Sequence, residues 1–482
     1  MISKYILSAA LAASLCHQAH AAESESSPPN VLFILIDDFG WNDVGYNGST
    51  FYETPQMDAF SEKWMRFDHC YTPSPMCSPT RASILTGKNP ARHGITQWLS
   101  GSDQPHTRKE ETPQVYCPLP RSNGLQENEI TLGEAFQEAG YDTAFFGKWH
   151  MGKIRITGGP KNHGYDSQVA VIEENGCRQF SYKRYFRNAK PGQSFNDALN
   201  DAVIDFIRQE CDKPFYLHLS HFAMHAPIVT SPELRARFEA KKKALGITTA
   251  DTELDEYSHI PHKLQQDSAE YAGELFNLDE GLGRVIDALK ESGQYENTII
   301  VLTGDNGGRT TIDKPDATAT VPLRGGKTFL FDGGLRVPTL IHWPAHSKAG
   351  MQTDAIVSSM DFYPTLLDMA GLPLKPEQHR DGVSLVPLFK GGSLDRDTLY
   401  WHFPHYQGEG SYPASAIRKD NFKLILNYHH GDVLLYDLAE DPHETKNLAL
   451  SMPEKAAELE RELIAYLKET EATIPQAQTP DQ

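Results

Sequence analysis

The sequence predicts an α/β fold: a large, mostly parallel central sheet flanked by helices, with a smaller C-terminal domain that holds a short antiparallel sheet and a helix. Short apolar runs alternate along the chain with stretches whose apolar residues recur at helical spacing. Four of the apolar runs end directly in polar clusters. Because open α/β sheets bind ligands at the carboxyl ends of their strands, we expect these clusters to form one site.

The four apolar runs are interpreted as strands of the central sheet. They and the polar residues that follow are residues 31–36 with Asp37-Asp38, 143–146 with Gly147-Lys148-Trp149-His150, 215–219 with His221 and His225, and 299–303 with Gly304-Asp305-Asn306. One such cluster would mean little, since unrelated surface groups also follow strands. Four clusters, each with a carboxylate, a lysine or a histidine, favour a shared site.

Helices are predicted between these strands. Residues 132–140 end on a glycine that suits a helix C-terminus, and residues 198–207 and 269–289 place their apolar side chains on one face. Residues 241–266 are rich in charge and lack periodicity, which predicts an excursion on the surface.

The pattern changes near Gly391-Gly392-Ser393. Residues 416–428 and 433–438 are predicted as two strands around a His-His-Gly-Asp turn, and residues 454–468 as a charged amphipathic helix. We therefore divide the chain into a signal peptide (1–21), a catalytic domain (22–393) and a C-terminal subdomain (394–482).

The N-terminus has the features of a secretory signal. Lys4 precedes an apolar stretch at 5–15, and Ala19-His20-Ala21 matches the small-x-small cleavage pattern. The stretch is too short to span a bilayer as a helix, so we predict an exported bacterial protein, periplasmic or secreted, without membrane insertion. A buried N-terminal helix and a lipid anchor at Cys16 are the alternatives.

Composition excludes several classes of protein. The 482 residues include 45 Lys and Arg against 64 Asp and Glu, a net charge of −19 that repels nucleic-acid backbones and anionic lipids. A hydrophobic content of 39% excludes a disordered chain.

Removal of the predicted signal peptide, which contains Cys16, leaves an odd number of cysteines. They are Cys70, Cys77, Cys117, Cys177 and Cys211, so one lacks a partner in any disulfide pattern, which the sequence leaves open. A buried free thiol is the simplest explanation. Cys77 differs, because Pro79 can open a helix that Gly87 closes. Cys77 then lies at a helix N-terminus, which favours an anion.

Residues 77–87 read Cys-Ser-Pro-Thr-Arg-Ala-Ser-Ile-Leu-Thr-Gly. This segment resembles the signature C-x-P-x-R, continued by A-S-x-L-T-G, of the formylglycine-dependent sulfatases in the alkaline phosphatase superfamily. The resemblance extends over residues 30–38, 147–150, 304–307, 323–327, 333–338 and 435–438. Within the family, the chain is similar to the bacterial carbohydrate sulfatases. It implies a sulfatase-like fold and the hydrolysis of sulfuric esters.

The resemblance implies that a formylglycine-generating maturation enzyme oxidises Cys77, which would explain the odd cysteine. One hydroxyl of the hydrated aldehyde attacks sulfur and the other later expels sulfate. The resemblance also implies one Ca²⁺ at four residues, Asp37, Asp38, Asp305 and Asn306. Oxygen donors suit Ca²⁺ or Mg²⁺, and adjacent carboxylates are costly without a cation.

The remaining candidates are cations and histidines. A sulfate ester needs fixed cations, for which Arg81, Lys148 and Lys327 are the candidates. The resemblance implies that His150 handles a proton on the formylglycine hydroxyls and that His225 protonates the departing alcohol.

Four further residues stay undecided at this stage. His221 is expected behind the site, while His163, Arg324 and Arg336 are candidates for substrate contacts or for ion pairs.

Three functions are compared. The favoured one is an exported sulfatase that acts on a sulfated galactan or glycosaminoglycan fragment with a galactose-type sugar, an expectation that rests on the resemblance and the compartment. A phosphomonoester or phosphonate hydrolase on the same fold is the alternative, but two-zinc phosphatases show Asp-His where this chain has Asp305-Asn306. A non-catalytic polysaccharide-binding protein would not need Cys77, Arg81 and both histidines together.

Overall fold

The computed structural model describes residues 27–99, 115–172, 185–186, 189–190, 193–209, 212–248, 252–311 and 317–477. The predicted signal peptide, Cys16, Cys177 and Cys211 lie outside these residues. In the described part of the chain, Cys70, Cys77 and Cys117 are free thiols. No helix there combines the length and apolar character that a membrane crossing requires.

The central sheet has eight strands in the order β12-β2-β11-β10-β1-β7-β5-β6. Strand β1 pairs in parallel with both β10 and β7, and β5 pairs in parallel with β7 and β6. Strand β11 runs antiparallel to its neighbours β10 and β2. The predicted mostly parallel sheet is therefore confirmed, and its four predicted strands are neighbours. The strands are β1 (Asn30–Ile36), β2 (Met65–Phe67), β5 (Asp142–Lys148), β6 (Ser167–Ile172), β7 (Phe215–Ser220), β10 (Thr298–Gly304), β11 (Leu340–His342) and β12 (Gln352–Thr353).

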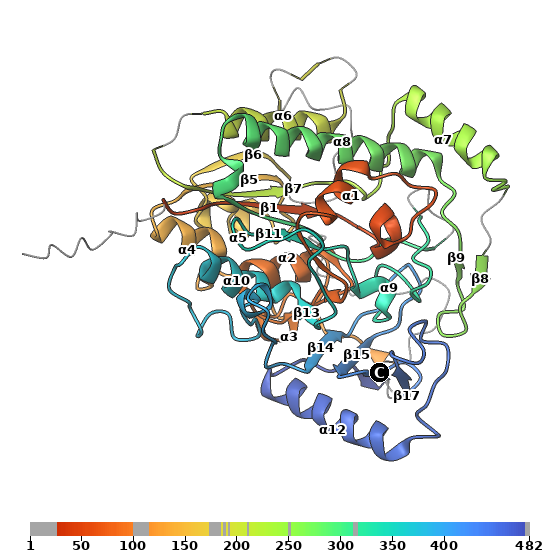
Figure 1. Ribbon diagram of the computed structural model, residues 1–482. Helices are drawn as coiled ribbons and strands as arrows, with labels where there is room; N and C mark the ends of the chain where they lie inside the picture. Colours follow the sequence, from red (N-terminus) through yellow and green to blue (C-terminus); the bar gives the residue numbers. More distant parts are fainter. Residues whose placement is uncertain are drawn as a thin grey trace, which may run out of the picture.

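Helices cover both faces of this sheet (Figure 1). Helices α6 (Phe195–Ile207) and α8 (Ala269–Glu291) lie on one face, and α2 (Cys77–Thr86), α4 (Leu132–Glu138) and α10 (Phe362–Met369) lie on the other. Alternate side chains of β1 enter the two separate hydrophobic clusters beneath these layers. The predicted helices at 132–140, 198–207 and 269–289 are confirmed as α4, α6 and α8.

Local hydrogen bonds set the helix ends. The Thr131 hydroxyl accepts the Glu134 N–H at 3.1 Å, and the Glu134 carboxylate accepts the Thr131 N–H at 2.7 Å. Helix α2 ends at Gly87, whose φ of 66° is left-handed, and a Cβ there would meet Cβ of His379 at 2.4 Å. Helix α2 begins at Cys77, two residues before Pro79, so Cys77 lies in its first turn.

The other elements are short or peripheral. They are α1 (Pro55–Ser61), β3 (Cys70–Tyr71), α3 (Pro90–His93), β4 (Val115–Tyr116), α5 (Ile154–Thr157), α7 (Pro232–Ala244), β8 (Thr252–Leu254), β9 (Pro261–Lys263), α9 (Asp332–Leu335), β13 (Val357–Ser358), α11 (Val386–Phe389) and β18 (Gln476–Ala477). The predicted excursion at 241–266 is wrong in part, because it holds the end of α7 and the β8–β9 hairpin, and because Ser258, His262 and Gln266 are buried.

A second, antiparallel sheet follows in the order β14-β15-β16-β17, with α12 (Pro453–Glu469) beside it (Figure 1). The strands are β14 (Thr398–Phe403), β15 (Ala414–Lys419), β16 (Phe422–Asn427) and β17 (Asp432–Asp437). The single strand predicted at 416–428 is wrong: it is two strands that turn at Asp420, whose φ is 52°. The helix at 454–468 is confirmed, and the domain boundary at 393 and 394 stays a prediction.

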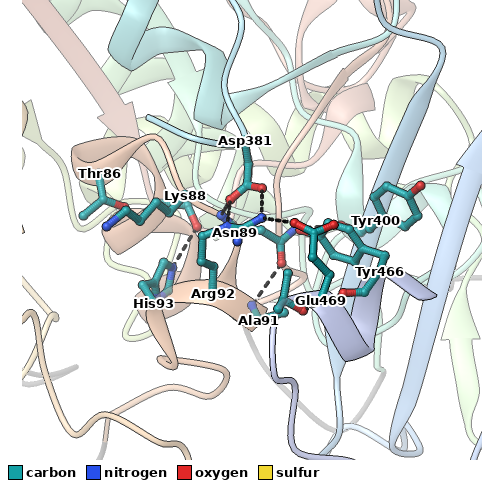
Figure 2. A network of polar contacts seen from close by, with 12 residues as sticks. Thr86, Lys88, Asn89, Ala91, Arg92, His93, Asp381, Tyr400, Tyr466 and Glu469 are labelled. Atoms are coloured by element: carbon teal, nitrogen blue, oxygen red, sulfur yellow. Dashed lines mark hydrogen bonds and ion pairs between the residues drawn. The ribbon is translucent and has the colours of Figure 1, made fainter. Parts of the chain in front are cut away.

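Polar contacts tie this second sheet to the segment that follows α2 (Figure 2). The carboxylate of Asp381 accepts the Asn89 N–H at 2.8 Å and two hydrogen bonds from Arg92 at 3.0 Å each. The Asn89 side chain donates to the Tyr400 carbonyl of β14 at 2.9 Å, and Tyr400 stacks on Tyr466 of α12 with ring centroids 3.9 Å apart. The second sheet and α12 are therefore fixed relative to α2.

A buried ion cluster also links the second sheet to α9. Lys423 of β16 is fully buried, and its ammonium lies 2.9 Å from Asp332 of α9 and 2.8 Å from Glu444. The hydroxyl of Tyr71 also donates to Asp332, at 2.7 Å. Because the charges are enclosed by protein, each depends on the others for its solvation.

We expect Lys423→Met to lower the free energy of unfolding by about 3–5 kcal/mol, since it removes the cation in contact with Glu444 and the nearer cation beside Asp332, for which Arg336 at 3.8 Å is only a partial substitute. Denaturant titration measures the change. Lys290→Met is the matched control, because Lys290 contacts Asp287 at the surface with its side chain 50% exposed, and its effect should stay within about 0.5 kcal/mol. Equal effects of the two substitutions would contradict the prediction.

Candidate active site

The carboxyl ends of four neighbouring strands meet the first turn of α2. Asp37 and Asp38 follow β1, Lys148 ends β5, and Asp305 follows β10. The strand between β1 and β5 is β7, and the segment that follows it carries His225. The structure thus brings the four predicted clusters and Cys77 to one place.

Arg81 and Lys148 hold two of the carboxylates. The Arg81 guanidinium lies 2.7 Å from Oδ2 of Asp305 and 3.7 Å from Oδ1 of Asp37, and the Lys148 ammonium contacts the other oxygen of Asp37. Burial by itself would raise the pKa of Asp37, but the charges of Lys148 and Arg81 lower it to about 2. Asp37 is therefore ionised at neutral pH.

Lys327 and Asn306 hold the third carboxylate. The Lys327 ammonium lies 2.6 Å from Oδ1 of Asp38, and the Asn306 side chain donates to the same oxygen at 2.8 Å. Nε2 of His225 lies 3.9 Å from Oδ2 of Asp38. Burial, followed by the charge of Lys327, lowers the pKa of His225 to about 4.

Cys77 faces His150. Sγ of Cys77 lies 3.3 Å from Nδ1 of His150, and both side chains are buried. Burial raises the pKa of the Cys77 thiol, and burial followed by the charge of Lys148 lowers the pKa of His150 well below its usual range. The imidazole is consequently neutral and can exchange a proton with a group at position 77.

The oxygen-rich part of the site fits a hard divalent cation. One carboxylate oxygen each of Asp37 and Asp305 and Sγ of Cys77 lie within 4.8 Å of one another. Oδ1 of Asp37 and Oδ1 of Asn306 are buried and have no hydrogen-bond partner among the described residues. Burial, followed by the charge of Asp37, raises the pKa of Asp305 to about 7. Close carboxylates with unbound oxygens are the donor set that Ca²⁺ prefers.

The backbone just beyond the strands is unusual. Asp38 and His150 have φ angles of 52° and 53°, in the left-handed region that non-glycine residues seldom occupy. Gly147 has a φ of 103°, and a Cβ there would meet the Ser220 carbonyl oxygen at 1.9 Å. Glycine is therefore required where β5 passes β7 beside the site.

Ser220 is a site residue that the sequence did not reveal. Its hydroxyl accepts a hydrogen bond from Arg81 Nη1 and donates to the Lys148 carbonyl at 2.8 Å. Arg81 Nη1 also donates to that carbonyl at 3.0 Å. Ser220 thereby fixes the guanidinium, and its only signal in the sequence is its place between a predicted strand and His221.

The undecided residues lie away from these contacts. His221 is buried, with Nδ1 3.3 Å from Oδ1 of Asn196, and His163 lies 3.3 Å from the Thr157 carbonyl. The two arginines are ion-pair partners: Arg324 binds Asp255 at 2.8 Å and Arg336 lies 3.8 Å from Asp332.

Comparison with known proteins decides the family. A family model described as Sulfatase matches residues 29–372, and one described as N-sulphoglucosamine sulphohydrolase, C-terminal, matches residues 326–473. The chain belongs to the sulfatase family. A sulfatase of Formosa agariphila is 30% identical, over 94% of this chain and 90% of that protein. Human N-acetylgalactosamine-6-sulfatase is 27% identical, over 94% of this chain and 88% of that protein.

Solved structures agree with this assignment. The crystal structure of Ps i-CgsB is 27% identical, covers 92% of this sulfatase and 93% of its own chain, and has a TM-score of 0.71. A phosphonate monoester hydrolase of Agrobacterium radiobacter, at 22% identity and a TM-score of 0.65, shares the fold alone. This sulfatase is accordingly a sulfuric ester hydrolase with a sulfatase-like α/β fold, as the sequence predicted.

Proposed function

We propose that this sulfatase removes sulfate from short sulfated carbohydrate fragments, with a galactose-type sugar preferred. The proposed nucleophile is a formylglycine formed from Cys77, and the proposed metal cofactor is one Ca²⁺ bound by Asp37, Asp38, Asp305 and Asn306. The observation that carries the proposal is the position of Cys77, which lies in the first turn of α2 and 3.3 Å from His150.

The proposed groups would supply the nucleophile and its activation. When formed and hydrated, formylglycine offers a hydroxyl that can attack sulfur, and a bound Ca²⁺ would lower the pKa of that hydroxyl and polarise a sulfate oxygen. His150, with Nδ1 facing position 77, would take up and return the proton of that hydroxyl.

Three cations would bind the sulfate. Arg81, Lys148 and Lys327 lie in contact with the three carboxylates Asp37, Asp38 and Asp305, whose charges they balance. A divalent cation added to this balanced set makes the pocket positive, although the whole chain carries −19. Such a pocket attracts one sulfate locally, whereas the acidic surface gives no long-range steering to a long polyanion.

His225 would protonate the leaving alcohol. Its Nδ1 lies 2.8 Å from the Ala226 carbonyl and donates to it, which fixes the ring and leaves Nε2 for the substrate. The ring can be reached from solvent, since 11% of this side chain is exposed. A bound sulfate ester places negative charge beside Nε2 and so favours a proton there.

The relatives support a carbohydrate substrate. Human N-acetylgalactosamine-6-sulfatase is 27% identical to this chain. Ps i-CgsB, whose crystal structure in complex with k-i-k-neocarrahexaose is 26% identical with a TM-score of 0.71, was solved with an oligosaccharide bound. The predicted signal peptide would place the enzyme outside the inner membrane, where such fragments are available.

A desulfation panel tests the proposal. Sulfate release, measured by ion chromatography, should be found with galactose and N-acetylgalactosamine sulfates and with short oligosaccharides that carry them. Glucosamine sulfates and intact polysaccharides should react more slowly. Turnover of simple aryl sulfates together with no turnover of any sulfated sugar would refute the carbohydrate proposal.

A further inference from the structure

Two charged side chains from distant parts of the chain meet beside the catalytic groups. Arg309 lies four residues after Asp305, and Glu409 lies in the segment 404–413 that connects β14 to β15, which we call the 404–413 loop. Arg309 Nη2 donates to Oε1 of Glu409 at 2.9 Å, and each side chain is 14% exposed. The pair is therefore enclosed but reachable from solvent.

Several contacts place Arg309 next to Lys327. The Lys327 N–H donates to the Gly308 carbonyl at 2.9 Å, while the Lys327 ammonium binds Asp38. Although burial has the larger effect on each, the charge of Arg309 acts to lower the pKa of both Asp38 and Lys327. Arg309 is therefore near both groups. Lys327 and His225 are also the most exposed of the proposed catalytic and cation-binding groups. The Arg309–Glu409 pair, itself partly exposed, is consequently close to Lys327 and Asp38.

The 404–413 loop also contacts the segment that follows α2. His405 of this loop lies 2.8 Å from the Thr96 hydroxyl, and the Leu99 N–H donates at 3.1 Å to the hydroxyl of Ser78, the residue after Cys77. Gln97 and Gln407 are buried, yet Nε2 of each lacks a hydrogen-bond partner among the described residues. Together these contacts pack the 404–413 loop against the segment that follows α2.

Arg309 and Glu409 together offer the hydrogen-bond donors and acceptors that bind sugar hydroxyl groups. A guanidinium donates and a carboxylate accepts, so together they match neighbouring hydroxyl groups on a sugar ring. Their charges cancel, which distinguishes them from the cations that face the sulfate. A second sulfate or a carboxylate that faces Glu409 in place of a hydroxyl would be repelled by its carboxylate, whose attraction to Arg309 is already used within the pair.

We propose that Arg309 and Glu409 bind the sugar ring that carries the scissile sulfate, and that Glu409 selects a free hydroxyl over a second anionic group. The inference rests on the proposed carbohydrate function and specifies the sugar as one with a single anionic group near the reacting sulfate. The competing explanation is a purely structural link between the 404–413 loop and the catalytic groups.

Glu409→Gln separates the two explanations, because it keeps the size and removes the charge. We expect the ratio of kcat/KM for N-acetylgalactosamine 4,6-disulfate to that for the monosulfated sugars to rise about tenfold, since a like-charge repulsion is relieved. Glu409→Asp keeps the charge and should keep the wild-type ratio. A structural link would lower both kcat/KM values together and leave the ratio unchanged.

The surface pair Arg208–Glu291, 3.0 Å apart and 65% exposed at Glu291, supplies the control. Glu291→Gln should leave the ratio unchanged, and thermal unfolding checks that every variant is folded. An unchanged ratio in folded Glu409→Gln, with wild-type turnover of the monosulfated sugars, would overturn this inference alone. Absence of wild-type turnover on every sulfated sugar would overturn the proposed function and this inference with it.

Discussion

Replacement of Cys77 by alanine should reduce sulfate release by at least about 10⁴-fold, because it removes the precursor of the nucleophile. Cys77→Ser should be equally inactive, since a serine hydroxyl is not the hydrated aldehyde. The measurement is steady-state release of sulfate from a monosulfated sugar, with unfolding curves to show that each variant is folded. Wild-type rates in either variant would contradict the role of Cys77.

Mass spectrometry of the peptide that contains Cys77 gives an independent readout. Active protein should carry the aldehyde at this position, and an unmodified thiol in fully active enzyme would refute the mechanism. Cys117→Ser is the matched control, because Cys117 is another free thiol of the described chain and packs against Val115, Tyr406 and Tyr412 instead of facing His150. It should retain both turnover and the modification at Cys77.

The core strands could be predicted because their burial leaves a strong local signal. Residues 31–36 are buried on both faces of β1, so they appear in the sequence as one apolar run. The polar residues that end such runs, Asp37 and Asp305 among them, then meet because β1 and β10 are neighbours in register from Asn30 beside Thr298 to Ile36 beside Gly304. The fold and the clustering of these polar residues thus followed from local patterns together with one rule of sheet geometry, whereas the Ca²⁺ ligands followed from the resemblance to the sulfatases.

Other features depend on contacts that no local pattern reveals. Arg81 and Ser220 are 139 residues apart, and Arg309 and Glu409 are 100 residues apart, so neither pairing has a spacing signal. The same holds for Arg324, whose ion pair with Asp255 joins residues 69 positions apart, so the sequence did not distinguish a substrate contact from an ion pair. The turn at Asp420 was missed because apolar residues on both sides of it, at 416–417 and 424–426, suggest one continuous strand, although Asp420-Asn421 is itself a turn signal.

The acidic composition also needed the structure for its interpretation. A net charge of −19 suggests a protein that avoids anions. Three of the carboxylates, however, are gathered with three cations at one point, and these are the cations proposed to bind the sulfate. Local arrangement of charge, and not its total, therefore determines what this site can bind.

Asp37→Asn should weaken calcium binding by at least about 100-fold and reduce turnover in parallel, because it removes one of the charges that would hold the ion. Elemental analysis of purified protein should find about one calcium per wild-type chain and a substoichiometric amount in the variant, a readout that is independent of activity. Asp43→Asn is the matched control: Asp43 is buried nearby but binds the Tyr271 hydroxyl at 2.6 Å and the Gly40 N–H at 2.9 Å, outside the donor set. It should keep its calcium. A full equivalent of calcium in Asp37→Asn, or none in active wild-type enzyme, would show that these carboxylates do not form the metal site.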